Sequence, residues 1–231
     1  MIQEKENALF ERWKKERTEY VPFNEDGVVN PEQWEKTSPK IVFILRDTNE
    51  YKSDLRNFLK EGGRGHTWNN IVRWAEIILY NEYSNRIDDN EYSNRIDGNH
   101  RKKVLSSICA VNLKKQSGKG SSNLEDIKEA AKNDRCFIKE QLELYQPDIV
   151  IACGFGKVQT ASLLKEVIYG DAYSEWLNVN ELYYYRTERI NKDKPIYVIS
   201  MPHPSRAYPA AKWTNLLREL YNTLKNSGEV G

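Results

Sequence analysis

The sequence predicts an α/β protein in which a parallel sheet is covered by helices on both faces. Four short runs are almost continuously apolar, and they alternate along the chain with stretches whose apolar residues recur at helical spacing. Continuous apolarity is typical of strands buried on both faces, and strands that alternate with helices form right-handed βαβ units. The four runs cover residues 40–45, 108–113, 148–153 and 196–201.

The N-terminal residues 1–38 are predicted to form a helix and a loop that pack on a single α/β domain of residues 39–231. Apolar spacing over residues 9–20 indicates the helix. The next segment contains Pro22, Gly27 and Pro31, and such turn-forming residues favour a loop.

Further helices are predicted where apolar residues follow helical spacing between and after the four runs. These stripes cover residues 71–79, 124–142, 158–165 and 213–224, and Ser122 or Asn123 is expected to cap the second. The apolar and aromatic segment 182–186 is expected to add a strand or a hairpin.

One internal repeat interrupts the pattern, because residues 81–89 and 90–98 match at eight of nine positions. Two such short copies are too few and too small for a solenoid. They are therefore interpreted as a duplicated surface loop over residues 81–100, since surface loops tolerate insertion at little entropic cost.

The composition indicates a soluble cytoplasmic protein. The chain has 231 residues, a net charge of +1, 30% charged residues and a mean hydropathy of -0.77. This balance excludes a protein that coats DNA with overall positive charge, so a nucleic-acid site must be local. No apolar run approaches the ~20 residues that span a bilayer, and the first residues lack the apolar core of an export signal.

No cofactor or metal site is predicted from known motifs. The cysteines Cys109, Cys136 and Cys153 form no CxxC pair and lie in apolar stretches, so they are interpreted as reduced core thiols. The three histidines lack the spacing of metal ligands on a helix, and the glycine-rich segments match neither a P-loop nor the dinucleotide-binding pattern.

Polar side chains follow three of the predicted strands, at the edge where open parallel sheets bind ligands. Asp47, Asn112 and His203 stand there, and His203 is held between Pro202 and Pro204. Each has an alternative structural role: Asp47 as a helix cap, Asn112 as a partner for backbone groups, and His203 as part of a rigid turn. Their common placement favours a site.

Residues 101–120 carry six basic residues and no acid, beside the same edge of the sheet. Two interpretations remain open for this segment, a solvated face or a surface that contacts phosphates. The six residues are Arg101, Lys102, Lys103, Lys114, Lys115 and Lys119.

Over residues 39–224 the chain resembles the uracil-DNA glycosylase superfamily. The segment 136–154 is similar to the helix, Pro-x-Ile/Val-Ile/Val strand and glycine of that family, and 202–205 resembles its His-Pro-Ser motif. Residues 111–114 resemble the strand whose Asn reads the base, and 67–71 resemble the helix start after the first motif.

The resemblance implies a three-layer fold with a central four-stranded parallel sheet, and a monomeric DNA-repair enzyme that excises uracil or another altered base without a cofactor or a metal. It implies that Asp47 positions water, that Asn112 recognises the base and that His203 stabilises the departing base. An aromatic residue should stack on the base, and the candidates are Tyr51, Phe58 and Phe155. The expected DNA contacts are Lys114, Lys115, Ser205, Arg206 and Tyr208, the last as a wedge.

The first motif departs from the family, which has Gly and Pro where this chain has Leu45 and Thr48. Two alternatives therefore stay open. One is an inactive module of the same fold that binds nucleic acid or nucleotides, and the other is an enzyme that processes small nucleosides.

Overall fold

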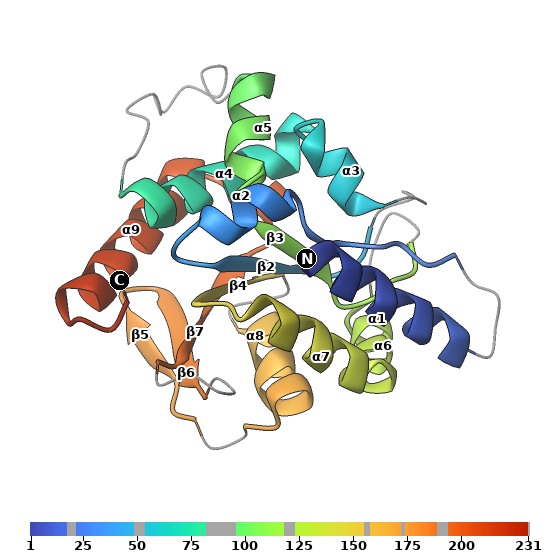
Figure 1. The fold of residues 1–231 in the computed structure, drawn as a ribbon. Helices are drawn as coiled ribbons and strands as arrows, with labels where there is room; N and C mark the ends of the chain where they lie inside the picture. Colours follow the sequence, from blue (N-terminus) through green and yellow to red (C-terminus); the bar gives the residue numbers. More distant parts are fainter. Residues whose placement is uncertain are drawn as a thin grey trace.

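A computed structural model describes residues 1–17, 22–48, 54–81, 96–117, 123–154, 158–171, 174–188 and 194–230. In it, a seven-stranded mixed sheet lies between two layers of helices (Figure 1). The predicted α/β class is confirmed, but the sheet is larger than the four strands expected from the sequence.

The four predicted runs form the parallel centre of this sheet. They are β2 (Ile41–Leu45), β3 (Cys109–Asn112), β4 (Ile149–Gly154) and β7 (Ile196–Pro202). Their spatial order is β3-β2-β4-β7, and every neighbouring pair among them is parallel. Their carboxyl ends therefore meet at one edge, and Leu45 pairs directly with Asn112 there.

Three short antiparallel strands extend the sheet at its two sides. β1 (Gly27–Val28) pairs with β3, whereas β6 (Leu182–Thr187) pairs with β7 and β5 (Leu177–Val179) pairs with β6. β6 confirms the strand expected over residues 182–186. The loop predicted around Gly27 and Pro31 is wrong in part, because this segment supplies β1 and the helix α2 (Pro31–Lys36).

Gly27 explains why a strand was missed there. Its φ is +127°, a backbone angle that residues other than glycine rarely adopt. A Cβ atom at this position would lie 2.2 Å from Glu6 Oε1 and 2.4 Å from the Tyr145 hydroxyl. The glycine therefore marks a close approach to buried polar groups, rather than the turn that the sequence suggested.

Each face of the sheet is covered by its own group of helices (Figure 1). Phe43 and Ile151 belong to the core on one face, and Val42 and Ile44 belong to the core on the other. The first face carries α3 (Leu55–Lys60), α4 (Gly65–Tyr80), α5 (Gly98–Leu105) and α9 (Ala210–Asn226). The second carries α1 (Ile2–Glu16), α6 (Leu124–Asn133), α7 (Arg135–Tyr145), α8 (Gln159–Leu163) and the π-helical turn η1 (Leu164–Tyr169).

The helix predicted over residues 124–142 is two helices that meet at Asp134. The Asp134 carboxylate accepts hydrogen bonds from Trp13 Nε1 at 2.7 Å and from Arg17 at 2.7 Å, so it joins this break to α1. The cap prediction is confirmed for Asn123, whose side chain accepts a hydrogen bond from the Glu125 amide.

Several other predictions are corrected at the edges of elements. Residues 82–95 of the repeat lie outside the described residues, and the end of the predicted loop belongs to α5 rather than to a loop. Cys109 and Cys153 are buried as expected, but Cys136 is exposed on α7.

No described helix combines the length and apolarity that a bilayer crossing requires.

Candidate functional site

A cavity of about 440 Å³ opens at the carboxyl edge of the parallel strands. Asp47 follows β2, Asn112 ends β3 and His203 follows β7, and all three line this cavity. The structure thus brings together the three residues that the sequence singled out. The other lining residues are Leu45, Thr48, Leu55, Phe58, Arg64, Thr67 and Trp68.

Asn112 is the most unusual of the three, because its side chain is buried without hydrogen bonds. The residue is 1% exposed, and neither Nδ2 nor Oδ1 has a partner. Buried amide atoms are normally hydrogen-bonded, since leaving one unpaired costs about 1–3 kcal/mol. The role of satisfying backbone groups is therefore not what its side chain does.

The backbone of Asn112 is held from behind by a buried ion pair. Its amide donates to Asp26 Oδ2 at 2.8 Å, and the same carboxylate accepts from Lys115 Nζ at 2.7 Å. Gln141 donates to Asp26 and accepts from Lys115, so it bridges the pair. Asp26, Lys115 and Gln141 are all fully buried.

The prediction that Lys115 contacts DNA is therefore wrong. Its ammonium group is enclosed between Asp26, Gln141 and the ring of Trp13, and burial lowers its pKa although Asp26 opposes that shift. Its physical role is to neutralise a carboxylate that fixes the end of β3. Sequence alone could not distinguish this lysine from its neighbour Lys114, which is partly exposed.

A second buried cluster joins the N-terminal helix to the wall of the cavity. Arg56 of α3 binds Glu6 of α1 at 2.9 Å and also contacts Asp54 and Glu25. Burial raises the pKa of Glu6 despite the backbone amide of Val28 and the Arg56 guanidinium, which favour its charged form. Since Leu55 lies beside Arg56 in α3 and lines the cavity, this cluster positions that wall.

The ring of His203 is oriented by its own turn, η2 (Pro204–Arg206). The Ser205 amide donates to His203 Nδ1 at 3.3 Å, and the Ser205 hydroxyl lies 2.8 Å from the same atom. Since Nδ1 accepts a hydrogen bond, a neutral ring carries its proton on Nε2. Nε2 is thus the ring atom that remains to donate to a ligand.

The electrostatic surroundings keep this imidazole neutral. Burial, followed by the positive charges of Arg46 and Arg206, lowers the pKa of His203 to about 4. Arg46 reaches this region across the end of β4, where its Cγ and Cδ would lie 3.5 Å from a Cβ at Gly154. Gly154 has no side chain to block that path, and its φ of +150° favours glycine in any case.

Helix α4 anchors the turn that carries His203. Asn70 Nδ2 donates to the Pro204 carbonyl at 2.7 Å, and Arg73 donates to Asn70 Oδ1 at 2.8 Å. The rigid-turn role considered for His203 is therefore real. It coexists with a place in the cavity wall and does not replace it.

Asp47 is partly exposed at the cavity, and the helix-cap alternative does not apply to it, because Asp54 caps α3. The neighbouring Thr48 is buried, and its hydroxyl accepts a hydrogen bond from Asn24 at 2.8 Å. Thr48, which stands where the uracil-DNA glycosylase motif has Pro, is thus held in place by side-chain hydrogen bonds.

The aromatic walls of the cavity are Phe58 and Trp68. Phe58 is one of the three stacking candidates proposed from the sequence, whereas Tyr51 and Phe155 lie outside the described residues. The sequence did not predict that Arg64, Thr67 and Trp68 would also line the cavity. The only hint was that 67–71 resembles a helix start next to the site.

The remaining predicted DNA contacts lie around His203 and Asn112. Arg206 and Tyr208 are exposed, the latter at 68%, and Ser205 and Lys114 are partly exposed. Of the other basic residues, Arg101 folds back to bond the Gly62 carbonyl and Asn69. Lys102 pairs with Glu61, Lys103 is exposed, and Lys119 lies outside the described residues. The basic segment is therefore only partly available to phosphates.

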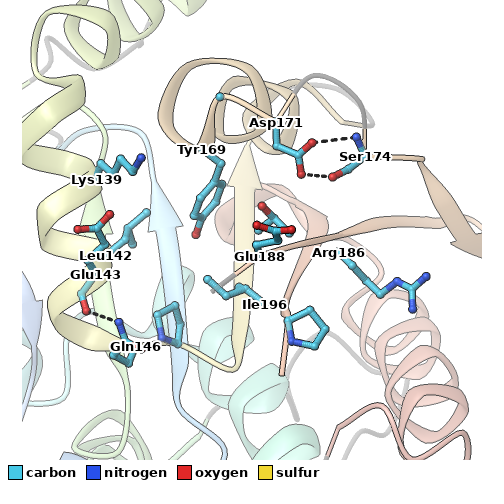
Figure 2. A pocket seen from close by; sticks show the side chains of 14 residues that line it. Lys139, Leu142, Glu143, Gln146, Tyr169, Asp171, Ser174, Arg186, Glu188 and Ile196 are labelled. Atoms are coloured by element: carbon cyan, nitrogen blue, oxygen red, sulfur yellow. Dashed lines mark hydrogen bonds between the residues drawn. The ribbon is translucent and has the colours of Figure 1, made fainter. Parts of the chain in front are cut away.

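A larger cavity of about 790 Å³ lies at the opposite edge of the sheet (Figure 2). Its walls come from the end of α7, the end of β6 and the start of β7, and they include Lys139, Glu143, Arg186 and Glu188. Asp171 also lines it, but its carboxylate accepts hydrogen bonds from Ser174 (Figure 2). None of the residues predicted from the strand ends lines this cavity.

The sequence matches no model of a known protein family, and no curated protein is significantly similar to it. Within the described residues, no group of three or more His, Cys, Asp or Glu side chains is arranged to hold a metal ion.

Proposed function

We propose that this protein is a DNA glycosylase-like enzyme, which hydrolyses the N-glycosidic bond of a uracil or another altered base flipped out of DNA. The observation that carries the proposal is the buried, unpaired amide of Asn112, in one cavity with Asp47 and His203. An amide that offers a donor and an acceptor side by side matches the edge of a pyrimidine, which presents the same pair of groups.

His203 is suited to stabilise the departing base. As the bond breaks, negative charge develops on the base, and a preorganised donor there typically contributes ~10²–10³ in rate. The ring is neutral and donates through Nε2, because Ser205 occupies Nδ1. The nearby charges of Arg46 and Arg206, which lower its pKa, also favour the anion that forms beside it.

Asp47 is suited to the sugar side of the reaction. A carboxylate near the developing sugar cation stabilises its positive charge and orients the attacking water. In the structure Asp47 lines the cavity together with Asn112, and the fixed turn at Thr48 holds it there. We assign to Asp47 the role of positioning and activating water.

Flipping a base out of a duplex costs a few kcal/mol, which contacts outside the cavity must offset. Ser205, Arg206 and Lys114 are exposed or partly exposed near His203 or Asn112 in the chain and are suited to contact strand phosphates, and exposed Tyr208 is suited to act as the wedge that fills the vacated stack. These contacts predict a local and salt-sensitive DNA affinity, in keeping with the near-neutral charge of the chain.

The test is a panel of oligonucleotides that carry uracil, hypoxanthine, xanthine or modified pyrimidines, assayed for alkali-labile abasic sites. The wild-type protein should release at least one of these bases, and both His203→Ala and Asp47→Ala should abolish release while leaving the fold intact. Asp126→Ala, an exposed change on α6, serves as the control and should keep full activity.

Three results would speak against the proposal. Salt-dependent DNA binding without any abasic product would identify an inactive binding module of this fold. Turnover of free nucleosides without DNA affinity would identify a nucleoside-processing enzyme. Wild-type excision by both His203→Ala and Asp47→Ala would refute the assigned roles.

A further inference from the structure

The larger cavity, at the amino ends of β4 and β7, has room for a small organic molecule (Figure 2). Its volume of about 790 Å³ corresponds to roughly 26 water molecules at ~30 Å³ each, and it lies in the range of ligand sites in proteins. Leu142, Pro147 and Ile196 form an apolar part of its wall. It shares no lining residue with the Asn112 cavity, so a ligand here would leave the carboxyl edge of the sheet free.

Two carboxylates line this cavity from different walls. Glu143 belongs to α7 and Glu188 follows the end of β6, and the ring of Tyr169 appears between them in Figure 2. Within the part of the chain that the structure describes, neither carboxylate forms an ion pair or accepts a hydrogen bond. Both are therefore available to a cationic group, and an aromatic ring in the same wall adds a cation–π contact.

The other charged side chains of the wall are less suited to a ligand. The Asp171 carboxylate is engaged by Ser174, whose amide donates to it at 2.9 Å. Arg186 and Thr187 are consecutive in β6, so their side chains leave opposite faces of the sheet, and Figure 2 shows the Arg186 guanidinium pointing away from the other lining residues. Lys139 of α7 also lines the cavity, and its charge would oppose a cation.

Thr187 is an independent sign that a ligand binds here. The residue is 6% exposed and lines the cavity. No residue that the structure describes forms a hydrogen bond with its hydroxyl. Its backbone pairs with Ile196 in the sheet, so the position of its side chain in the wall is fixed. Buried polar groups normally have partners, and this hydroxyl can accept a hydrogen bond from a ligand in the cavity.

We propose that this cavity binds a linear aliphatic diamine or polyamine, with one ammonium group at Glu143 and another at Glu188. The chain between the two groups would lie against the Tyr169 ring and the apolar wall, and the Thr187 hydroxyl would accept a hydrogen bond from an ammonium group. Two cationic groups joined by a flexible apolar chain match two carboxylates on different walls with apolar surface between them. This site does not depend on the function proposed for the Asn112 cavity.

The first measurement compares four probes of similar shape and different charge. The full chain is titrated in a calorimeter, at about 0.15 M salt, with spermidine, 1,4-diaminobutane, butylamine and 1,4-butanediol. Spermidine and diaminobutane should each bind at a single site. Butylamine should bind about tenfold more weakly than diaminobutane, because it forms one charge-assisted hydrogen bond in place of two. Butanediol should not bind detectably.

The second measurement repeats the titration with variants of the wall. Glu143→Gln and Glu188→Gln should each weaken diaminobutane binding by about tenfold and remove most of its advantage over butylamine. Thr187→Val should weaken binding by about three- to tenfold without loss of stability in urea unfolding, because its hydroxyl has no partner to lose. Lys139→Gln should strengthen binding, since it removes a like charge. Glu35→Gln, an exposed change on α2 outside this cavity, is the matched control and should bind as wild type does.

Equal diaminobutane affinities for wild type, Glu143→Gln and Glu188→Gln would overturn the inference, and so would the absence of saturable binding. An equal loss of affinity in Glu35→Gln would show attraction to negative surface charge only, and would overturn it as well. Asn112→Leu lies outside this wall and should leave diaminobutane binding unchanged, whether or not the protein releases a base. The two proposals can therefore fail separately.

Discussion

Replacing Asn112 with leucine should make the protein more stable and remove its function. The Asn112 side chain is 1% exposed and both polar atoms lack partners, so the folded protein without a ligand carries an uncompensated cost of desolvation. Leucine has the same number of non-hydrogen side-chain atoms as asparagine and no polar group to desolvate. The backbone bond from residue 112 to Asp26 is independent of the side chain and should persist.

The magnitude follows from the two unpaired atoms. An unsatisfied buried polar group costs about 1–3 kcal/mol, whereas a change of shape in a packed site costs up to about 1.5 kcal/mol. With two such atoms in one amide, Asn112→Leu should raise the free energy of unfolding by about 1–3 kcal/mol. For a chain of this size, that corresponds to an increase in Tm of roughly 2–4 °C for each kcal/mol.

The assay is urea unfolding of wild type and variant at equal protein concentration, with base release measured on the same samples. Asn70→Leu is the matched control, because Asn70 is also buried but its amide bonds Pro204 and Arg73. It should destabilise the protein, while Asn112→Leu stabilises it. If Asn112→Leu loses as much stability as Asn70→Leu, the amide has a structural partner and the reasoning about the ligand fails.

Three other predictions concern pH, charge and backbone. Since the pKa of His203 is about 4, base release should stay constant as pH falls from neutral and should halve near pH 4; NMR titration of the ring checks the assignment. Between pH 6.5 and about 4, His203 is protonated in the unfolded chain but stays neutral in the folded protein. The free energy of unfolding should therefore decrease as the pH is lowered through this window. Lys115→Met should cost about 3–5 kcal/mol in urea unfolding, because it leaves Asp26 charged and buried, yet the salt slope of DNA binding should not change. Gly154→Ala should cost on the order of 1–3 kcal/mol in the same assay, since φ is +150° and the new Cβ would lie 2.6 Å from Thr160 Oγ1.

The central strands were predictable because their apolar runs are buried on both faces and leave a continuous pattern in the sequence. The short edge strands were harder to predict from the sequence. β1 has two residues, begins with a glycine and is buried against Glu6, so nothing in its composition distinguishes it from a turn. The break between α6 and α7 depends on a tertiary contact, the bonds from Trp13 and Arg17 to Asp134, which apolar spacing cannot reveal.

The site was predictable to the extent that topology fixes it. Residues that follow neighbouring parallel strands must meet, and Asp47, Asn112 and His203 do line one cavity. What the sequence could not show is which lysine points inward. Lys114 and Lys115 are adjacent, and only the burial of Asp26 and Gln141 determines that the second is a structural cation.

The three residues share a physical arrangement that argues for function rather than chance. Each is held through its backbone or its own turn, and each leaves a polar group in the cavity wall. Asp26 fixes the amide of residue 112, and Asn70 fixes the carbonyl of Pro204 in the turn of His203. A protein under selection for stability alone would pair or remove the amide of Asn112, because an unpaired buried amide is costly. Under the proposed function, keeping that amide in a rigid position would give binding energy to a ligand that completes its hydrogen bonds.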